Sequence, residues 1–187
     1  SGSAARSWLT WPLQWPLGWS MPDRFDLLDV VGAISPVPVL LIHGTRDQIV
    51  GYQHAQALFD AARTLGVGFC LGYAELVHED GRERHFNTAI TVDKSGRIVA
   101  RYRKIHLFSP NLEHRRHGAG DRPCLVDTSL GRVGVLICYD LRFPELARYY
   151  FHRGAELLAI PGQWPEARAQ HWRTLLRARA IENEMFV

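Results

Sequence analysis

Cys138 stands at a position suited to nucleophilic chemistry. The apolar run at 132–138 predicts a buried strand that ends at this cysteine, and Pro144 begins a predicted helix soon after it. Reacting groups in α/β folds commonly lie at the carboxyl ends of such strands. A helix N-terminus and a nearby cation lower the pKa of a thiol, and the thiolate is the form that attacks. Position alone leaves two interpretations open, a catalytic thiol or an inert core cysteine.

Lys104 could supply that cation. Only two of the 22 basic residues are lysines, which makes the position of this one informative. It follows the alternating segment 97–102, which together with 86–92 and the turn sequence at 93–96 predicts a hairpin. An ammonium beside a thiolate favours the charged form and stabilises negative charge on an attacked carbonyl. The alternative is a solvated lysine at a strand end.

Strand and helix patterns alternate along the rest of the chain and predict the α/β class. Continuous apolar runs predict further buried strands at 37–42, 67–73 and 155–160. Helical spacing of apolar residues, or a proline start, predicts helices at 53–64, 144–152 and 166–183. An irregular segment rich in His, Arg, Gly and Pro is expected at 105–122.

Four segments then resemble, in order and spacing, those of the nitrilase (carbon–nitrogen hydrolase) superfamily, in its branch of ω-amidases and deaminated-glutathione amidases. The segments are Gly72-Tyr73-Ala74-Glu75 with Asn87-Thr88-Ala89, the lysine segment RYRKIHLF at 101–108, the nucleophile segment CYDLRFPE at 138–145, and the helix at 171–183. The resemblance covers about residues 57–187. It implies a partial nitrilase-type αββα sandwich and a thiol amidase that cleaves a small linear amide and releases ammonia, without a cofactor.

The resemblance also assigns roles. Cys138 would be the nucleophile, Lys104 the cation that supports the tetrahedral oxyanion, and Glu113 a second, substrate-positioning carboxylate. Other polar residues lie in loops near the strand ends and are predicted to bind substrate: Asp140, Arg142, Gln163 and Trp164.

Two departures from the family pattern define the rival hypothesis. The family's general-base glutamate belongs to an N-terminal strand–helix unit, yet no glutamate precedes Glu75, which matches a different, non-catalytic position. The family also continues beyond residue 187 with strands that complete the second sheet, so a truncated domain is expected. The alternative is therefore a catalytically inactive fusion remnant that acts as a binding or association module.

The N-terminal part resembles another class, the α/β-hydrolases. Residues 36–50 look like the strand and acid loop of that fold, with Asp47 at the position of the triad acid. No G-x-S-x-G elbow occurs in the chain, so an esterase is the weakest hypothesis and Asp47 is interpreted as a relic. We expect a chimeric chain, with an α/β-hydrolase-like fragment at 1–56 and a truncated nitrilase-like domain at 57–187. The tryptophan-rich stretch 8–19 is interpreted as packing, a lipid or partner surface, or cloning residue.

The composition limits which partners, metals and membrane segments are expected. A net charge of +3 is too small to indicate nucleic-acid binding, and no apolar run reaches the ~18 residues of a membrane span. Three cysteines without a C-x-x-C pair, and nine histidines without an H-E-x-x-H pattern, predict neither disulfides nor a metal site. We expect a cytoplasmic protein that acts on a small-molecule amide. The resemblance further implies a homodimer formed through the helices at 144–152 and 166–183.

Overall fold

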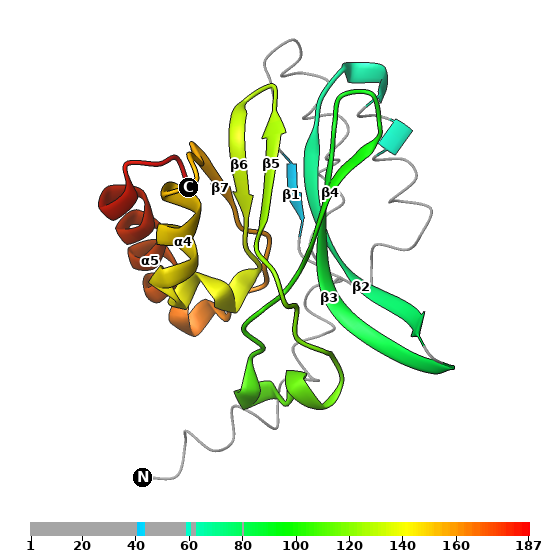
Figure 1. Cartoon of the computed structure of the whole chain (residues 1–187). Coiled ribbons are helices and arrows are strands. Elements are labelled where there is room, and N and C mark those ends of the chain that lie inside the picture. Colours follow the sequence, from blue (N-terminus) through cyan, green and yellow to red (C-terminus); the bar gives the residue numbers. More distant parts are fainter. Residues whose placement is uncertain (1–40, 44–58, 61–62, 80) are drawn as a thin grey trace, which may run out of the picture. The chain divides into compact units, whose positions relative to one another are not determined.

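The computed structural model places two β-sheets and a pair of helices in successive layers (Figure 1). It describes residues 41–43, 59–60, 63–79 and 81–187, all within a unit that spans 36–187. The predictions for the tryptophan-rich stretch, for Asp47 and for a domain boundary at residue 56 lie outside the described residues.

The first sheet has the strand order β1-β2-β3-β4. Its strands are β1 (Leu41–His43), β2 (Phe69–Glu79), β3 (Arg82–Val92) and β4 (Ile98–Arg103). The predicted hairpin between β3 and β4 is confirmed, and the Asp93 carboxylate accepts backbone hydrogen bonds from Ser95 and Arg97 across its turn. A second hairpin, which was not predicted, joins β2 to β3, so both strands run longer than their apolar cores indicated.

The second sheet has the order β5-β6-β7, from β5 (Cys124–Thr128), β6 (Gly131–Val135) and β7 (Leu157–Ala159). Helix α4 (Pro144–Phe151) connects the parallel strands β6 and β7, and α5 (Ala169–Asn183) follows β7. The predicted strand at 132–138 ends at Val135, and Cys138 begins the 3-10 turn η4 (Cys138–Arg142). Strand β5 was not predicted.

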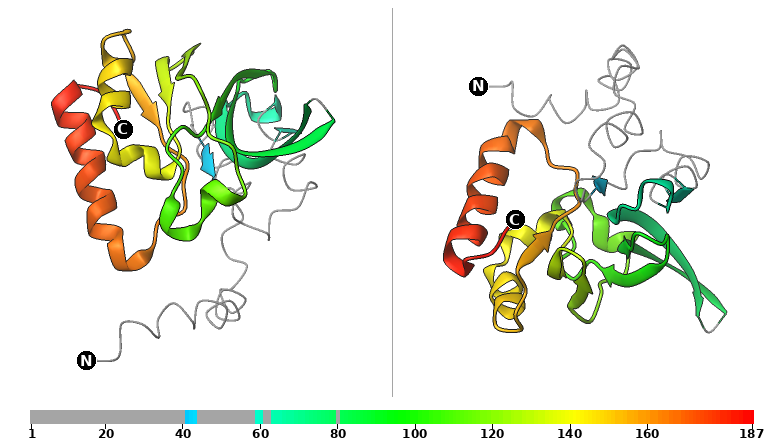
Figure 2. Two further views of the ribbon diagram at one scale, coloured as in Figure 1. Left: turned by 60° about the horizontal axis from the view of Figure 1, so that its bottom comes forward. Right: turned by 90° about the horizontal axis from the view of Figure 1, so that it is seen from above.

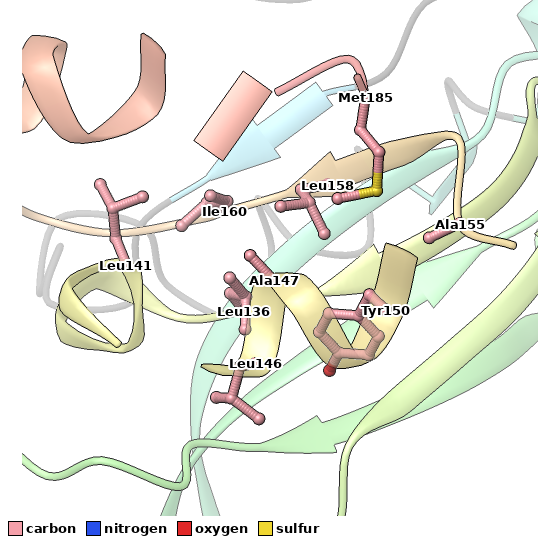
Figure 3. Packing of buried hydrophobic residues seen from close by; sticks show 9 residues of the cluster. All are labelled: Leu136, Leu141, Leu146, Ala147, Tyr150, Ala155, Leu158, Ile160 and Met185. Atoms are coloured by element: carbon pink, nitrogen blue, oxygen red, sulfur yellow. The ribbon is translucent and has the colours of Figure 1, made fainter. Parts of the chain in front are cut away.

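Two apolar clusters hold these layers together. Between the sheets, Cys70, Ala89 and Tyr102 pack against Val135 and neighbouring residues of the second sheet. On the other face of the second sheet, side chains from β7, η4 and α4 form a separate cluster (Figure 3). The central strands of the second sheet are therefore covered on both faces, which explains the apolar, buried residues Val133 and Val135 of β6 and Leu158 and Ala159 of β7. Figure 2 shows α4 and α5 on the side of this sheet that faces away from β2–β4.

The outer face of the first sheet also meets a helical segment. Side chains alternate along β2, so Phe69 points away from the inter-sheet cluster that contains Cys70. The ring of Phe59, in the helical residues 59–60, meets the Phe69 ring edge-on at a centroid distance of 5.1 Å. The α/β class predicted from the sequence is confirmed, with small sheets and helical residues against their outer faces.

Candidate active site

A buried ion pair joins Lys104 to Glu113. The Lys104 Nζ lies 2.7 Å from Glu113 Oε2, and the two side chains are 3% and 5% exposed. Lys104 follows directly after β4, where its backbone N–H donates to the carbonyl of Asn87 on β3. Glu113 begins the 3-10 turn η3 (Glu113–Arg115) after Leu112, whose φ of +60° turns the loop back toward β4. The structure thus brings together two of the residues that the sequence predicted for the site.

Every hydrogen bond that Glu113 accepts holds it in the ionised form. Besides Lys104, the Asn87 side-chain amide donates to Oε1 at 2.8 Å and the Phe108 backbone N–H donates to Oε2 at 2.6 Å. Burial opposes ionisation, but the Lys104 charge and these hydrogen bonds together keep the Glu113 pKa below its ordinary value. An ionised carboxylate with three donors orients the Lys104 ammonium. Sequence reasoning missed Asn87, although it belongs to one of the family-like segments.

Cys138 is held in an unusual backbone conformation. Its φ is +47°, in the left-handed region that non-glycine residues rarely adopt and that costs roughly 1–2 kcal/mol. Its N–H donates to the Pro161 carbonyl at 2.9 Å, and its thiol donates to the Gln163 carbonyl at 3.2 Å. A Cβ on Gly162 would lie only 2.7 Å from the Cys138 Cβ, so glycine is required there. The loop after β7 therefore forms one wall around the thiol.

The charges of Lys104 and Glu113 both act on the Cys138 thiol. Burial raises the pKa of Cys138, the Lys104 charge lowers it, and the charges of Glu113 and Asp140 raise it again. The net direction is upward, whereas the sequence led us to expect a lowered pKa. Burial is the largest cause of this rise, and the charges of Glu113 and Asp140 counteract the lowering by Lys104.

Asp140 differs from what the sequence indicated. It was predicted to bind substrate, but its side chain is completely buried. Its two oxygens accept hydrogen bonds from the Tyr102 hydroxyl, the Ile137 N–H and the His106 N–H, at 2.8 to 3.0 Å. A ligand has no access to this carboxylate. Its position in a polar loop motif does not reveal that it points inward.

Three further predicted residues lie on the loop side of the site. The Arg142 guanidinium lies 5.0 Å from the centroid of the Trp164 ring, and its Nη2 lies 3.4 Å from Nδ1 of His171. The Trp164 indole N–H donates to the Arg168 carbonyl at 2.9 Å. Gln163 meets Cys138 through its backbone carbonyl, while its side chain is exposed. Arg142 and Trp164 therefore form a unit with the start of α5.

The described residues contain no group of three or more His, Cys, Asp or Glu side chains arranged to hold a metal ion. Among the helices of the described part, none combines the length and the apolar character needed to cross a membrane.

Comparisons with known proteins agree on one family. The family model described as Carbon-nitrogen hydrolase matches residues 45–187. A 2-oxoglutaramate amidase of Bacillus subtilis is 44% identical over 54% of this chain, and a chloroplastic omega-amidase of Arabidopsis thaliana is 42% identical over 56% of it.

A solved structure is also similar. It is a mutant amidase from Nesterenkonia sp. AN1 with acrylamide added at its active-site cysteine, 25% identical at a TM-score of 0.66, with 85% of this chain and 67% of that chain covered. The chain spans only 39% and 31% of the lengths of the two curated amidases. Because the family model matches most of its residues, the chain belongs to the carbon–nitrogen hydrolase family.

Proposed function

We propose that this chain carries the reacting half of a thiol amidase that cleaves a small linear amide and releases ammonia. The observation that carries the proposal is the buried Lys104–Glu113 pair, whose two charges both act on the Cys138 thiol. The relatives named as amidases support it, as does the solved neighbour whose active-site cysteine adds acrylamide.

The reaction follows from the placement of these groups. The Cys138 thiolate adds to the amide carbonyl, and the negative charge that develops on oxygen is stabilised by the Lys104 ammonium. The carbon–nitrogen bond then breaks, and the departing nitrogen takes up a proton and leaves as ammonia. Water attacks the resulting thioester, which releases the carboxylic acid and restores the thiol.

Cys138 must lose its thiol proton before it can attack the carbonyl. The thiol donates to the Gln163 carbonyl, which cannot take up a proton, and Glu113 is fully engaged with Lys104, Asn87 and Phe108. We propose that the proton is lost to solvent, so turnover rises with pH until the raised pKa of Cys138 is passed.

Arg142 suggests the substrate class. Its guanidinium lies beside the Trp164 ring and His171 and is only part-buried, which suits a carboxylate at the far end of a short substrate. 2-Oxoglutaramate, named for a relative, is such a linear amide. We propose Arg142 and Trp164 as substrate-binding residues, with Gln163 contributing its backbone carbonyl.

Several expectations from the sequence stay proposals. They are a homodimer, an α/β-hydrolase-like fragment at 1–56 joined to a nitrilase-like domain at 57–187, and a cytoplasmic location. For the dimer, α5 carries Ile181 with 78% of its surface exposed, and α4 ends at Phe151, which is 37% exposed. Exposed apolar side chains on adjacent helices suit a subunit contact.

Ammonia release from 2-oxoglutaramate and from other short amides, measured from pH 6 to 10, tests the proposal. We expect release that increases with pH, is absent in Cys138→Ala and is unchanged in the matched control Cys124→Ala. A covalent acyl adduct found on Cys138 alone would identify the nucleophile. If no amide is hydrolysed or forms an adduct at any pH, the chain is an inactive remnant and the proposal fails.

A further inference from the structure

One buried carboxylate links the two segments that carry the reacting groups. Asp140 Oδ2 accepts the Tyr102 hydroxyl at 2.8 Å and the Ile137 N–H at 3.0 Å. Its Oδ1 accepts the His106 N–H at 2.8 Å and lies 2.9 Å from the His106 Nδ1. Asp140 therefore contacts Tyr102 and His106 of the lysine segment, and it also contacts Ile137, which precedes Cys138.

These contacts bracket the reacting side chains in sequence. Tyr102 and His106 stand two residues before and two residues after Lys104, and Ile137 immediately precedes Cys138. The Lys104 ammonium itself donates to Glu113 at 2.7 Å. The two carboxylates thus act on different parts of the lysine segment, Glu113 on the ammonium and Asp140 on the flanking residues.

The Asp140 contacts are well protected from solvent. Asp140 is 0% exposed and Tyr102 is 1% exposed. Burial and the neighbouring Asp140 charge raise the pKa of Tyr102, so its hydroxyl stays protonated and continues to donate. The His106 ring stacks on Phe143 at a centroid distance of 3.7 Å and an angle of 8°. Because a buried acceptor that loses its donors is costly, these contacts resist displacement.

Cys138 depends on such support. A residue at φ +47° keeps that conformation only where surrounding contacts outweigh its cost. The Cys138 N–H is tied to Pro161, and the preceding Ile137 N–H is tied to Asp140. The same carboxylate therefore stabilises the strained turn and connects it to the lysine segment.

We propose that Asp140 is a positioning residue that fixes the spacing between the Lys104 ammonium and the Cys138 thiol. This inference rests on the proposed function, since it takes Lys104 and Cys138 as the reacting pair. It replaces the substrate-binding role that the sequence indicated for Asp140. Such control matters because the effect of an ammonium on a thiolate falls steeply with separation.

The test must separate position from charge. The titratable groups around Asp140 are Tyr102, His106 and Tyr150. The charges of Lys104, Glu113 and Asp140 all act on Cys138, so removing the Asp140 charge alone would change the Cys138 pKa. The quantity to measure is therefore the coupling between Lys104 and Cys138. Lys104→Gln removes the charge and keeps a donor for Glu113, and its effect on Cys138 alkylation is compared among backgrounds.

In the otherwise unchanged protein, we expect Lys104→Gln to slow Cys138 alkylation at fixed pH by about tenfold. In the Asp140→Asn background the same substitution should slow it by less than about twofold, and in Tyr102→Phe, which removes no charge, by about threefold. Tyr150→Phe is the matched control, because it also removes a buried tyrosine hydroxyl, one that bonds the Val135 carbonyl and the Cys124 N–H. The tenfold effect should persist there.

Cys70 reports folding in the same experiment, since it is 0% exposed and burial raises its pKa to about 12. If Asp140→Asn exposes Cys70 to alkylation, that variant is not folded, and the positioning role of Asp140 is then tested by Tyr102→Phe. An undiminished tenfold effect in folded Asp140→Asn or Tyr102→Phe overturns the positioning role. Absence of any Lys104→Gln effect in the unchanged protein refutes the proposed function instead.

Discussion

Two buried carboxylates, Glu75 and Glu113, each bond to residues on β3 and at or after β4, but their surroundings differ. Glu75 accepts the hydroxyl of Thr88 on β3 and the guanidinium of Arg103 on β4. Glu113 accepts the amide of Asn87 on β3 and the ammonium of Lys104, the residue after β4. Because consecutive residues point to opposite faces of a sheet, the two arrangements lie on opposite faces of one hairpin.

The difference lies in burial and in the cation. Arg101 and Arg103, the partners of Glu75, are 54% and 29% exposed, and the Arg103 guanidinium also stacks on the Phe86 ring at 3.9 Å. Lys104 is 3% exposed and its charge reaches the Cys138 thiol. A forked, stacked arginine is held rigidly, whereas a lysine is a compact charge on a flexible stem. The first site braces the sheet, and the second can respond to a charge that forms beside it.

The largest effect that separates the two sites should be on turnover. Lys104→Gln removes the group proposed to stabilise the developing oxyanion, so we expect ammonia release to fall by roughly a hundredfold or more. Arg103→Gln, on the opposite face, should retain most of the rate. Steady-state hydrolysis of the best amide substrate measures the rates of both variants. Equal losses of rate would show that Lys104 is no more important for turnover than Arg103.

The next effect should be on stability. Glu113→Gln leaves the Lys104 ammonium buried without its partner, and breaking a buried pair in this way costs about 3–5 kcal/mol. Urea unfolding at pH 7 measures the free energy, with Glu75→Gln as the matched variant. We expect a smaller loss for Glu75→Gln, because its arginine partners reach solvent. A larger loss of unfolding free energy in Glu75→Gln than in Glu113→Gln would contradict this prediction.

A third effect should appear in acid. Burial opposes ionisation of Glu75, but Arg103, Thr88 and Arg101 hold its pKa below the ordinary value, and the Glu113 pKa is lowered too. Carboxylates with a lowered folded pKa stabilise the fold above their unfolded pKa of about 4.3, and this stabilisation is lost as pH falls further. Unfolding free energies from pH 6 to 3 should therefore decline less steeply in Glu75→Gln than in the unchanged protein. An identical slope would show that Glu75 does not contribute.

The smallest effect should come from the exposed partner. The Arg101–Glu75 contact is 3.1 Å long, but Arg101 is more than half exposed, so we expect Arg101→Gln to cost less than about 1 kcal/mol. Thermal unfolding at low and high salt measures this cost. A loss of stability comparable to that of Glu113→Gln would mean that the ion pair at Glu75 stabilises the fold as much as the buried Lys104–Glu113 pair does.

Sequence reasoning succeeded where the information is local. The hairpin turn at 93–96 was predicted because its Asp, Ser and Gly residues are typical of a tight turn. Strand β5 escaped prediction because five residues carry too little periodicity. The raised pKa of Cys138 was not foreseen, because it comes mainly from burial of the thiol and then from the charges of Glu113 and Asp140, which only the folded chain brings near it. Asp140 was misplaced because three of its four contacts come from Tyr102 and His106, which are distant in sequence, and these contacts help to decide where its side chain points.

The most direct test of the account is the pH at which Cys138 becomes half-reactive toward iodoacetamide, resolved from Cys70 and Cys124 by mass spectrometry. We predict a midpoint above that of a free thiol, about 8.5, in the unchanged protein. Lys104→Gln should raise the midpoint, Glu113→Gln should lower it, and Glu75→Gln should leave it unchanged. If Lys104→Gln and Glu113→Gln shift it in the same direction, or not at all, the two charges do not act on Cys138 and the account is contradicted.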